Sequence, residues 1–359
     1  MFTRYVHVTQ KQRFLKAPWA QNRACVTGEV MENAVKMVEI LRGGRVESSH
    51  MGHAVICNGK GEVVRAWGNP DAVIFPRSSC KMIQALPLLE SGVGRDLTPA
   101  HLAMACASHQ GAAVHTDFVA RWLADLGLAE SDLRCGAHEP YDIAARDGLI
   151  RAGDTPCQIH NNCSGKHTGF LMLTQAMKAG PEYVDPDHPL QHAILAATNE
   201  VTQETSPGYG IDGCSAPNHA CTVHGLARAM ASFAVANDTG DTRQRAMHRL
   251  THAMYAHPNL VAGESRACTE LMRAVTVPVS LKTGAEAVFT AILPTLGLGI
   301  ALKIADGGTR ASEAMITGML ADLGVLDPAH PAALRRLGGS MRNCRGMETG
   351  SVRLVDGLI

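Results

Sequence analysis

Two serines and a lysine open an apolar segment at residues 75–89, which read FPRSSCKMIQALPLL. A serine hydroxyl becomes a nucleophile at neutral pH when a neighbouring base accepts its proton, and a lysine can be that base once burial or positive charge lowers its pKa. Residues three apart share one face of a helix, so Lys81 would lie one turn from Ser78, whereas Ser79 would point about 100° away. The spacing favours Ser78 as nucleophile and Lys81 as base, although a capping serine followed by a solvated lysine has the same pattern.

A second serine and a second lysine follow in an order that supports this chemistry. Ser108 lies in CASHQG after a predicted helix, and Lys282 begins the tripeptide KTG after the apolar segment VPVSL. Class A β-lactamases and penicillin-binding proteins have an SxxK motif, an SDN motif and a KTG motif in this order. His109 follows Ser108 here, so the middle motif departs from that pattern. KTG alone would be an ordinary turn, but the three elements together predict a serine acyl-transfer site.

The scarcity of lysine supports a base role for Lys81 and Lys282. The chain has 9 lysines and 24 arginines, so arginine is its usual cation. An arginine cannot lose its proton in a protein, whereas a lysine in a dehydrated site can. We therefore expect the lysines of the two motifs to act as proton acceptors.

Two cysteine-containing turns form a second candidate site. IHNNCSGKHTGF contains Cys163, Lys166 and His167, and GIDGCSAP contains Asp212 and Cys214. The first turn is not a phosphate-binding loop, because a histidine replaces the first glycine of that motif and another replaces the hydroxyl residue after the lysine. Two thiolates and a nitrogen can hold Zn²⁺ with one coordination position open. Since these thiols lack CxxC spacing, buried structural cysteines are the alternative.

The elements that must position these residues are of two kinds. The first segments alternate apolar and polar side chains around the hairpin signal NGKG, and strand-like segments return near the end of the chain. Residues 76–274 show the spacing of helices. Neither strand group alone can bury a face. We therefore predict an α+β fold in which residues 35–75 and 275–359 form an antiparallel sheet with flanking helices, and residues 76–274 form an inserted, mostly helical domain that carries the site.

Composition argues against several classes of function. The chain has 33 basic and 33 acidic residues among 359 and no run of either sign, so binding to nucleic acid or to an anionic membrane surface is not expected. No apolar stretch of the sequence is long enough to predict a membrane span. Residues 1–34 lack a secretory pattern and are interpreted as a loosely attached leader. The 11 scattered cysteines favour a reducing cytoplasm, and a small molecule is the expected partner.

Seven motifs of the chain together resemble those of the Rhizobium etli type of L-asparaginase. They are RSSCK, MACASHQG, LRCGAHEP, NNCSGKHTGF, IDGCSAP, AHPNLVAGE and LKTGAEAVF. They occur in order between about residues 35 and 350, and NNCSGKHTGF is long and unusual. The resemblance implies a fold like that of serine β-lactamases and glutaminases, a homodimer, and hydrolysis of L-asparagine to L-aspartate and ammonia.

The resemblance also implies roles for residues that are present here. The family's two Ser-Lys pairs fall on Ser78 with Lys81 and on Ser108 with Lys282. Its zinc ligands fall on Cys163, Lys166 and Cys214. Its neighbouring polar residues, which bind the substrate, fall on His167 and Asp212. In the implied mechanism Lys81 takes the Ser78 proton, the serine attacks the side-chain amide, ammonia leaves, and water hydrolyses the acyl-enzyme. Ser108 and Lys282 would relay a proton to the leaving ammonia, and zinc would orient the substrate.

Two alternatives follow from the same residues. A glutaminase or a penicillin-recognising enzyme would use the same catalytic logic, although the altered middle motif and the missing export signal count against the latter. A non-catalytic zinc-binding dimer, in which the serines only cap helices, is the other reading. The start SSCK also differs from the alanine-rich version associated with the family, which places a thiol beside the expected nucleophile.

Overall fold

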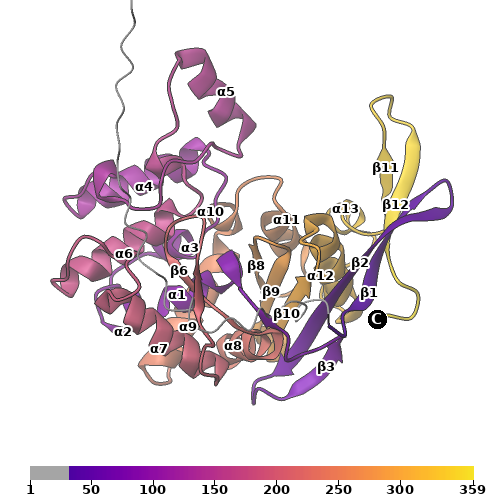
Figure 1. Ribbon diagram of the computed structural model, residues 1–359, viewed down its shortest axis with the longest axis horizontal. Helices are drawn as coiled ribbons and strands as arrows, with labels where there is room; N and C mark the ends of the chain where they lie inside the picture. Colours follow the sequence, from indigo (N-terminus) through magenta and orange to yellow (C-terminus); the bar gives the residue numbers. More distant parts are fainter. Residues whose placement is uncertain (1–31) are drawn as a thin grey trace, which may run out of the picture.

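The computed structural model describes residues 32–359, and Figure 1 shows a helical region beside an antiparallel sheet. The leader expected at residues 1–34 therefore lies almost entirely outside the described residues. Among residues 32–359, no helix is both long enough and apolar enough to cross a membrane.

One eight-stranded sheet contains strands that are far apart in the sequence. Its order is β11-β12-β1-β2-β10-β9-β8, and β3 pairs with β2. The strands are β1 (Val35–Arg42), β2 (Arg45–Asn58), β3 (Val63–Trp67), β8 (Ser280–Gly284), β9 (Val288–Leu293), β10 (Leu298–Ile304), β11 (Ser340–Arg342) and β12 (Glu348–Leu354). Strand β2 joins the two groups, because Ile56 pairs with Ile300 of β10. The predicted antiparallel sheet of early and late strands is confirmed.

Helices cover the central strands, since all residues of β9 and nearly all of β10 are buried. Helix α8 (Val223–Val235) packs on β2, β9 and β10, and α12 (Thr309–Asp322) packs on β1, β9, β10 and β12. Gly299 allows the close approach of α8, because a Cβ atom there would lie 2.0 Å from the backbone nitrogen of Ala231.

The region between the two strand groups is mostly helical, as predicted. Its helices besides α8 are α1 (Lys81–Gln84), α2 (Leu86–Glu90), α3 (Pro99–Ala105), α4 (Ala113–Asp125), α5 (Ile143–Ala152), α6 (Ser164–Ala176), α7 (Pro189–Thr202), α9 (Thr242–Ala256), α10 (Pro258–Val261) and α11 (Ala267–Ala274). Its short strand pairs are β4 (Val73–Ile74) with β7 (Cys221–Thr222) and β5 (Tyr209–Ile211) with β6 (Pro217–His219). The expected start of α3 is present, because the Thr98 side chain accepts a hydrogen bond from the His101 backbone N–H.

The apolar segment 75–89 is not one continuous helix. It consists of the 3₁₀ helix η2 (Arg77–Cys80) followed by α1 and α2. Pro87 lies in the first turn of α2 and cannot donate a hydrogen bond to the preceding turn, which separates α2 from α1. Ser78 and Lys81 therefore lie on two different helical pieces.

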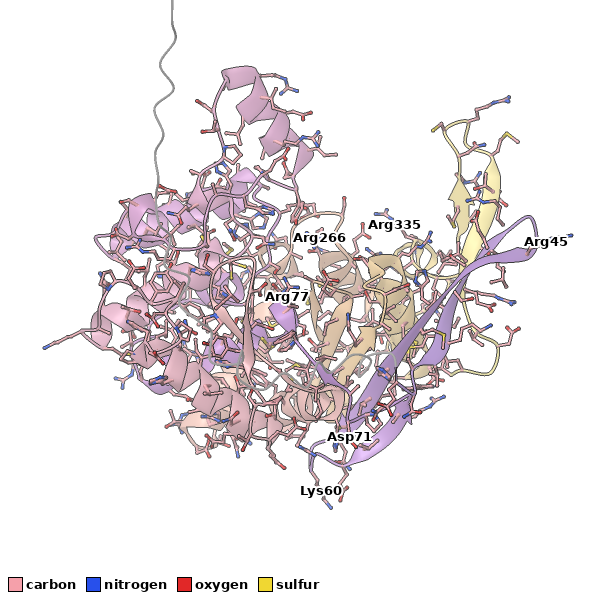
Figure 2. The ribbon with its side chains drawn as sticks, in the orientation of Figure 1. Arg45, Lys60, Asp71, Arg77, Arg266 and Arg335 are labelled. Carbon is pink, nitrogen blue, oxygen red and sulfur yellow. The ribbon has the colours of Figure 1, made fainter. Side chains whose placement is uncertain are left out.

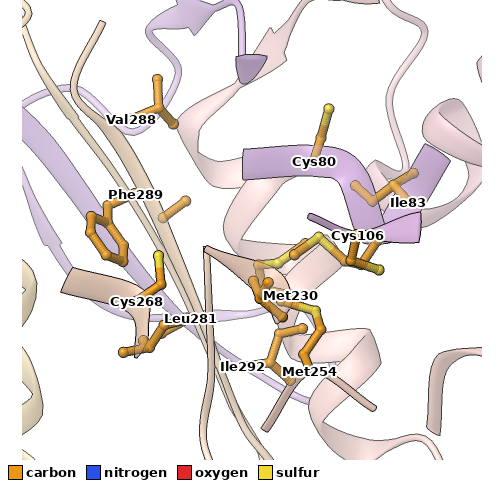
Figure 3. Packing of buried hydrophobic residues seen from close by; sticks show 14 of the residues in the cluster. Cys80, Ile83, Cys106, Met230, Met254, Cys268, Leu281, Val288, Phe289 and Ile292 are labelled. Atoms are coloured by element: carbon orange, nitrogen blue, oxygen red, sulfur yellow. The ribbon is translucent and has the colours of Figure 1, made fainter. Parts of the chain in front are cut away.

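The helical region packs against the sheet through a buried apolar core. Figure 3 shows this junction, where Cys106, Met230 and Met254 approach Leu281 and Ile292 of the sheet. All ten cysteines of residues 32–359 are free thiols and eight of them are buried, which agrees with their interpretation as small core residues. Helix α5 is different, because none of its residues is buried and it projects from the body in Figure 1.

Candidate active site

The backbone just before Ser78 has an unusual conformation that one side chain holds in place. Arg77 has φ 52°, in the left-handed region that costs a non-glycine residue about 1–2 kcal/mol. The buried Asn218 of β6 accepts a hydrogen bond from the Arg77 N–H at 3.0 Å and donates its Nδ2 to the Arg77 carbonyl at 3.3 Å. The backbone N–H and the carbonyl of Arg77 are therefore both bonded to the side-chain amide of Asn218, which fixes the start of η2.

The two serines of η2 have different environments. The Ser79 hydroxyl is buried and donates a hydrogen bond to the Pro76 carbonyl at 2.7 Å. Ser78 is partly exposed, and its hydroxyl forms no hydrogen bond with residues 32–359. Of the two serines, Ser78 is therefore the one that solvent or a ligand can reach.

Lys81 bonds to the second serine of the predicted set. Its buried Nζ donates to Ser108 Oγ at 2.9 Å, to Cys163 Sγ at 3.1 Å and to the Ala107 carbonyl. These three acceptors match the three N–H donors of a lysine ammonium. The hydrogen-bonded Ser-Lys pair is therefore Ser108 with Lys81, which differs from the pairing that the family resemblance implies.

Lys282 is fully buried on β8 and has one hydrogen bond, to the Thr283 carbonyl at 2.9 Å. Burial, and then the charge on Lys81, lower its pKa from 10.5 to about 7. Alternate residues of a strand share a face, so Lys282 lies on the same face as Gly284. A Cβ atom at Gly284 would lie 3.1 Å from the Ser79 backbone nitrogen, so this face of β8 is directed at η2. The strand of the buried Lys282 therefore packs against η2, the helix that carries Ser78.

The predicted thiol site is assembled in the core beside Lys81. The buried Lys166 Nζ lies 3.2 Å from Cys214 Sγ. Cys163 contacts Cys214, and this contact together with burial raises the pKa of Cys163. The same contact lowers the pKa of Cys214, against the effect of burial and with help from the Lys166 charge. Two thiols and two lysines therefore share one buried cluster.

The donor set of this cluster fits Zn²⁺. Cys163, Cys214 and Lys166 supply two soft sulfur donors and one nitrogen, which is a suitable ligand set for zinc. His167 is buried beside Cys214, and its interaction with the thiol helps to lower the pKa of Cys214. Within that range, no group of three or more His, Cys, Asp and Glu side chains has the arrangement of a metal site, so the lysine would have to be a ligand.

The two expected substrate-binding residues have protein partners. Asp212 Oδ1 accepts hydrogen bonds from Arg77 Nε at 3.0 Å and Nη2 at 2.8 Å, which joins the serine-bearing helix to the turn that holds Cys214. His167 Nδ1 lies 2.9 Å from the Tyr183 hydroxyl, and burial followed by the Lys166 charge lowers the pKa of this histidine to about 4. Figure 2 shows Arg77 in the central part of the molecule, between the helical region and the sheet.

A family profile described as L-asparaginase II matches residues 38–354. The chain belongs to the L-asparaginase II family. The match spans both strand groups and every predicted site residue. The family assignment supports an amidohydrolase.

Comparison with other proteins gives weaker similarities. No curated protein sequence matches the chain. The crystal structure of Mglu in its native form has 12% sequence identity and a TM-score of 0.44, and the match covers 78% of this chain and 66% of that one. Mglu in its glutamate form has 13% identity, a TM-score of 0.45 and coverages of 76% and 60%. A β-lactamase from Mycobacterium bovis has 14% identity, a TM-score of 0.42 and coverages of 76% and 94%. The chain thus spans less than two thirds of these two Mglu chains.

Sequence reasoning missed two residues that shape the site in this asparaginase-family protein. Arg77 had a visible signal, because it immediately precedes Ser78 in RSSCK. Asn218 had none, since only the folded chain brings β6 to η2. Their contacts depend on a left-handed backbone at a residue other than glycine, which sequence patterns do not predict.

We expect Asn218→Ala to lower kcat by about 10- to 100-fold with little change in KM, because Ser78 would lose its fixed position relative to the bound amide. Steady-state kinetics with L-asparagine measures this. Asn218→Asp keeps an acceptor for the Arg77 N–H but has no Nδ2 donor, so its kcat should be intermediate. An unchanged kcat in Asn218→Ala would show that η2 holds Ser78 in place without the side-chain amide of Asn218.

Proposed function

We propose that this protein hydrolyses L-asparagine to L-aspartate and ammonia through a serine acyl-enzyme. The observation that carries the proposal is the partly exposed Ser78, whose hydroxyl is free of hydrogen bonds to the described residues, beside the strand of Lys282, a buried lysine with a pKa of about 7. A hydroxyl and a neutral amine are the two groups that acyl transfer from a carboxamide requires. The L-asparaginase II family supports a carboxamide substrate.

In the proposed reaction Lys282 accepts the Ser78 proton as Ser78 Oγ attacks the side-chain amide carbon. This role differs from the sequence-based prediction, which gave it to Lys81. The change is supported by the hydrogen bonds of Lys81, which use all three of its donors, and by the lowered pKa of Lys282. The backbone N–H of Ser78 at the start of η2 is proposed as a donor to the developing oxyanion.

Departure of ammonia needs a proton at the leaving nitrogen. Lys81 and Ser108 form a hydrogen-bonded chain that can deliver one, since Lys81 Nζ donates to Ser108 Oγ at 2.9 Å. The hydroxyl of Ser108 can donate in turn to the amide nitrogen. These transfers leave Lys282 protonated and Lys81 neutral, so Lys282 first passes its proton to Lys81 or to solvent. Neutral Lys282 then accepts a proton from the water that attacks the ester of Ser78, the proton returns to Ser78 Oγ as the ester bond breaks, and L-aspartate is released.

We propose that Cys163, Lys166 and Cys214 hold Zn²⁺, which would supply an open coordination position for a polar end of the substrate. The protein residues around it have their own tasks. Arg77 and Asp212 hold the turn of Cys214 against η2, and burial keeps water from the two thiols.

Cys214→Ser should remove bound zinc and raise KM more than it lowers kcat, because the proposed metal positions the substrate and does not activate the nucleophile. Metal analysis of the purified protein gives the first readout and steady-state kinetics the second. Cys221→Ser is the matched control, since this buried thiol lies outside the cluster. Full retention of zinc in Cys214→Ser would refute the ligand assignment, and zinc loss with unchanged KM would make the metal structural.

Ammonia release from L-asparagine and L-glutamine, and ring opening of a chromogenic β-lactam, test the substrate class. We expect turnover of L-asparagine and a covalent adduct on Ser78 that mass spectrometry of quenched samples detects. Ring opening of the β-lactam or preference for glutamine would favour the alternatives, and no turnover of any of them would favour a non-catalytic protein. We also propose a homodimer, on the family resemblance, which sedimentation measurements test.

A further inference from the structure

Arg266 occupies a position between the two catalytic segments. It lies on the loop between α10 and α11, at the start of α11. Before it, Gly263 packs so closely on the loop of Ser108 that a Cβ atom there would lie 2.4 Å from the Gln110 side chain. After it, Cys268 Sγ accepts a hydrogen bond from the Thr283 backbone N–H, next to Lys282. The loop of Arg266 is therefore fixed at both ends to elements that carry site residues.

The guanidinium of Arg266 has no carboxylate partner in residues 32–359, although carboxylates are close in the sequence and in space. Three glutamates among them are each paired with another arginine. The pairs are Glu264 with Arg273, Glu270 with Arg335 and Arg336, and Glu313 with Arg336. The contact that Arg266 does make is with the Tyr141 ring, whose centroid lies 5.8 Å from the guanidinium carbon.

This arrangement leaves a partly exposed, oriented cation at the site. A guanidinium has five N–H donors in a fixed plane, and a ring contact orients that plane without using the donors. Tyr141 is 59% exposed and Arg266 is partly exposed, so solvent or a ligand can reach the donors. Figure 2 shows Arg266 over the boundary between the helical region and the sheet, where Arg77 also lies.

The charges near Arg266 favour an anionic ligand. Burial and Lys81 lower the pKa of Lys282 most, and Arg266 adds to this effect, so the guanidinium is within electrostatic reach of that amine. The nearby carboxylate Asp212 is already bonded to Arg77. Among residues 32–359, Arg266 thus has no carboxylate partner, and the carboxylate of an amino acid would supply one.

We propose that Arg266, oriented by Tyr141, binds the α-carboxylate of the amino-acid substrate. The proposal rests on the amidohydrolase function proposed above and adds the residue that selects a free amino acid over a simple amide. A planar carboxylate matches the paired N–H groups of a guanidinium, which a lysine ammonium cannot reproduce.

The test compares Arg266→Gln and Arg266→Lys with the parent on three amides. L-asparagine has both charged groups, succinamate lacks the amino group, and β-alaninamide lacks the carboxylate. In Arg266→Gln we expect kcat/KM to fall by about 10- to 100-fold for L-asparagine and succinamate and to stay unchanged for β-alaninamide. Arg266→Lys should lose nearly as much as Arg266→Gln. Arg273→Gln, which changes a paired arginine of the same helix, should alter all three by less than about twofold.

Two results would overturn the proposal and each is distinct from a failure of the function itself. Equal losses on all three amides would show that Arg266 supports the fold or the catalytic lysine. Unchanged kinetics on L-asparagine would place the carboxylate elsewhere. If the parent hydrolysed none of the three amides, the proposed function would be wrong and this inference with it.

Discussion

Replacing Ser78 by alanine should lower the rate of ammonia release by about 10⁴-fold or more, because the acyl-enzyme cannot form without this hydroxyl. The folded structure should remain, since the Ser78 hydroxyl makes no hydrogen bond with residues 32–359 whose loss would destabilise them. Ammonia release under single-turnover conditions measures the loss, and the thermal unfolding midpoint checks the fold.

Ser79→Ala is the matched control for this change. The Ser79 hydroxyl bonds only to the Pro76 carbonyl, so its removal should cost a few-fold in activity and about 1 kcal/mol in the free energy of unfolding. The nucleophile assignment would be wrong if Ser79→Ala lost activity and Ser78→Ala kept more than about a tenth of it. If Ser108→Ala lost turnover but accumulated a stable adduct on Ser78, Ser108 would act in hydrolysis of the acyl-enzyme and not in its formation.

The second large effect is expected for Lys282→Met. In the parent, kcat/KM should rise as the pH increases through about 7, because Lys282 accepts a proton only in its neutral form and its pKa is about 7. The variant should lose about 10³-fold in kcat/KM, and this rising limb should disappear from its pH profile. If the rising limb of the pH profile near pH 7 persisted in Lys282→Met, the limb would belong to the titration of another group.

The same substitution should make the protein more stable. The pKa of Lys282 falls from 10.5 to about 7 on folding, so in this pH range the unfolded chain binds more protons and stability decreases as the pH falls. Near pH 7 the buried amine costs on the order of a few kcal/mol, and methionine removes that cost. Urea unfolding at pH 7 and pH 10 should show a gain for Lys282→Met that is larger at pH 7.

Lys303→Met is the control for both readouts. Lys303 lies on β10, which is separated from β8 by β9, and burial lowers its pKa as well. Its amine contacts the Glu286 carbonyl and no predicted catalytic residue. Its substitution should leave the pH profile unchanged. A less stable Lys282→Met would mean that the amine is satisfied in the folded state and that the physical basis of the proposed base is wrong.

The fold was predictable where local patterns are strong. Alternating side chains and the NGKG turn predicted β2 and β3, and the return of strands after residue 275 predicted that one sheet contains both groups. The break in the segment 75–89 was within reach of the sequence, because Pro87 is visible there. The pairing of Ile56 with Ile300 was not, since register depends on contacts between distant segments.

For the site, the residue types were predictable but their partners were not. The motifs brought Ser78, Lys81, Ser108 and Lys282 to attention, and the structure brings Lys81 to Ser108. That contact depends on the path of the loop after α3, which has no sequence signature. Arg266 was missed for a related reason, because an arginine is a candidate for binding only when its neighbouring carboxylates are known to be occupied.

The sheet joins strands that the ribosome makes at different times. Ile56 of β2 finds its partner only when Ile300 has been synthesised, which takes on the order of 10–50 s at about 5–20 residues per second. Until then the nascent chain exposes the unpaired edge of β2 and apolar side chains that the folded protein buries. The helices between β2 and β10 in the sequence can already form during this time. Such edges pair readily with other chains. We therefore expect the folding yield to rise when the nascent chain is protected or when the middle region is translated faster.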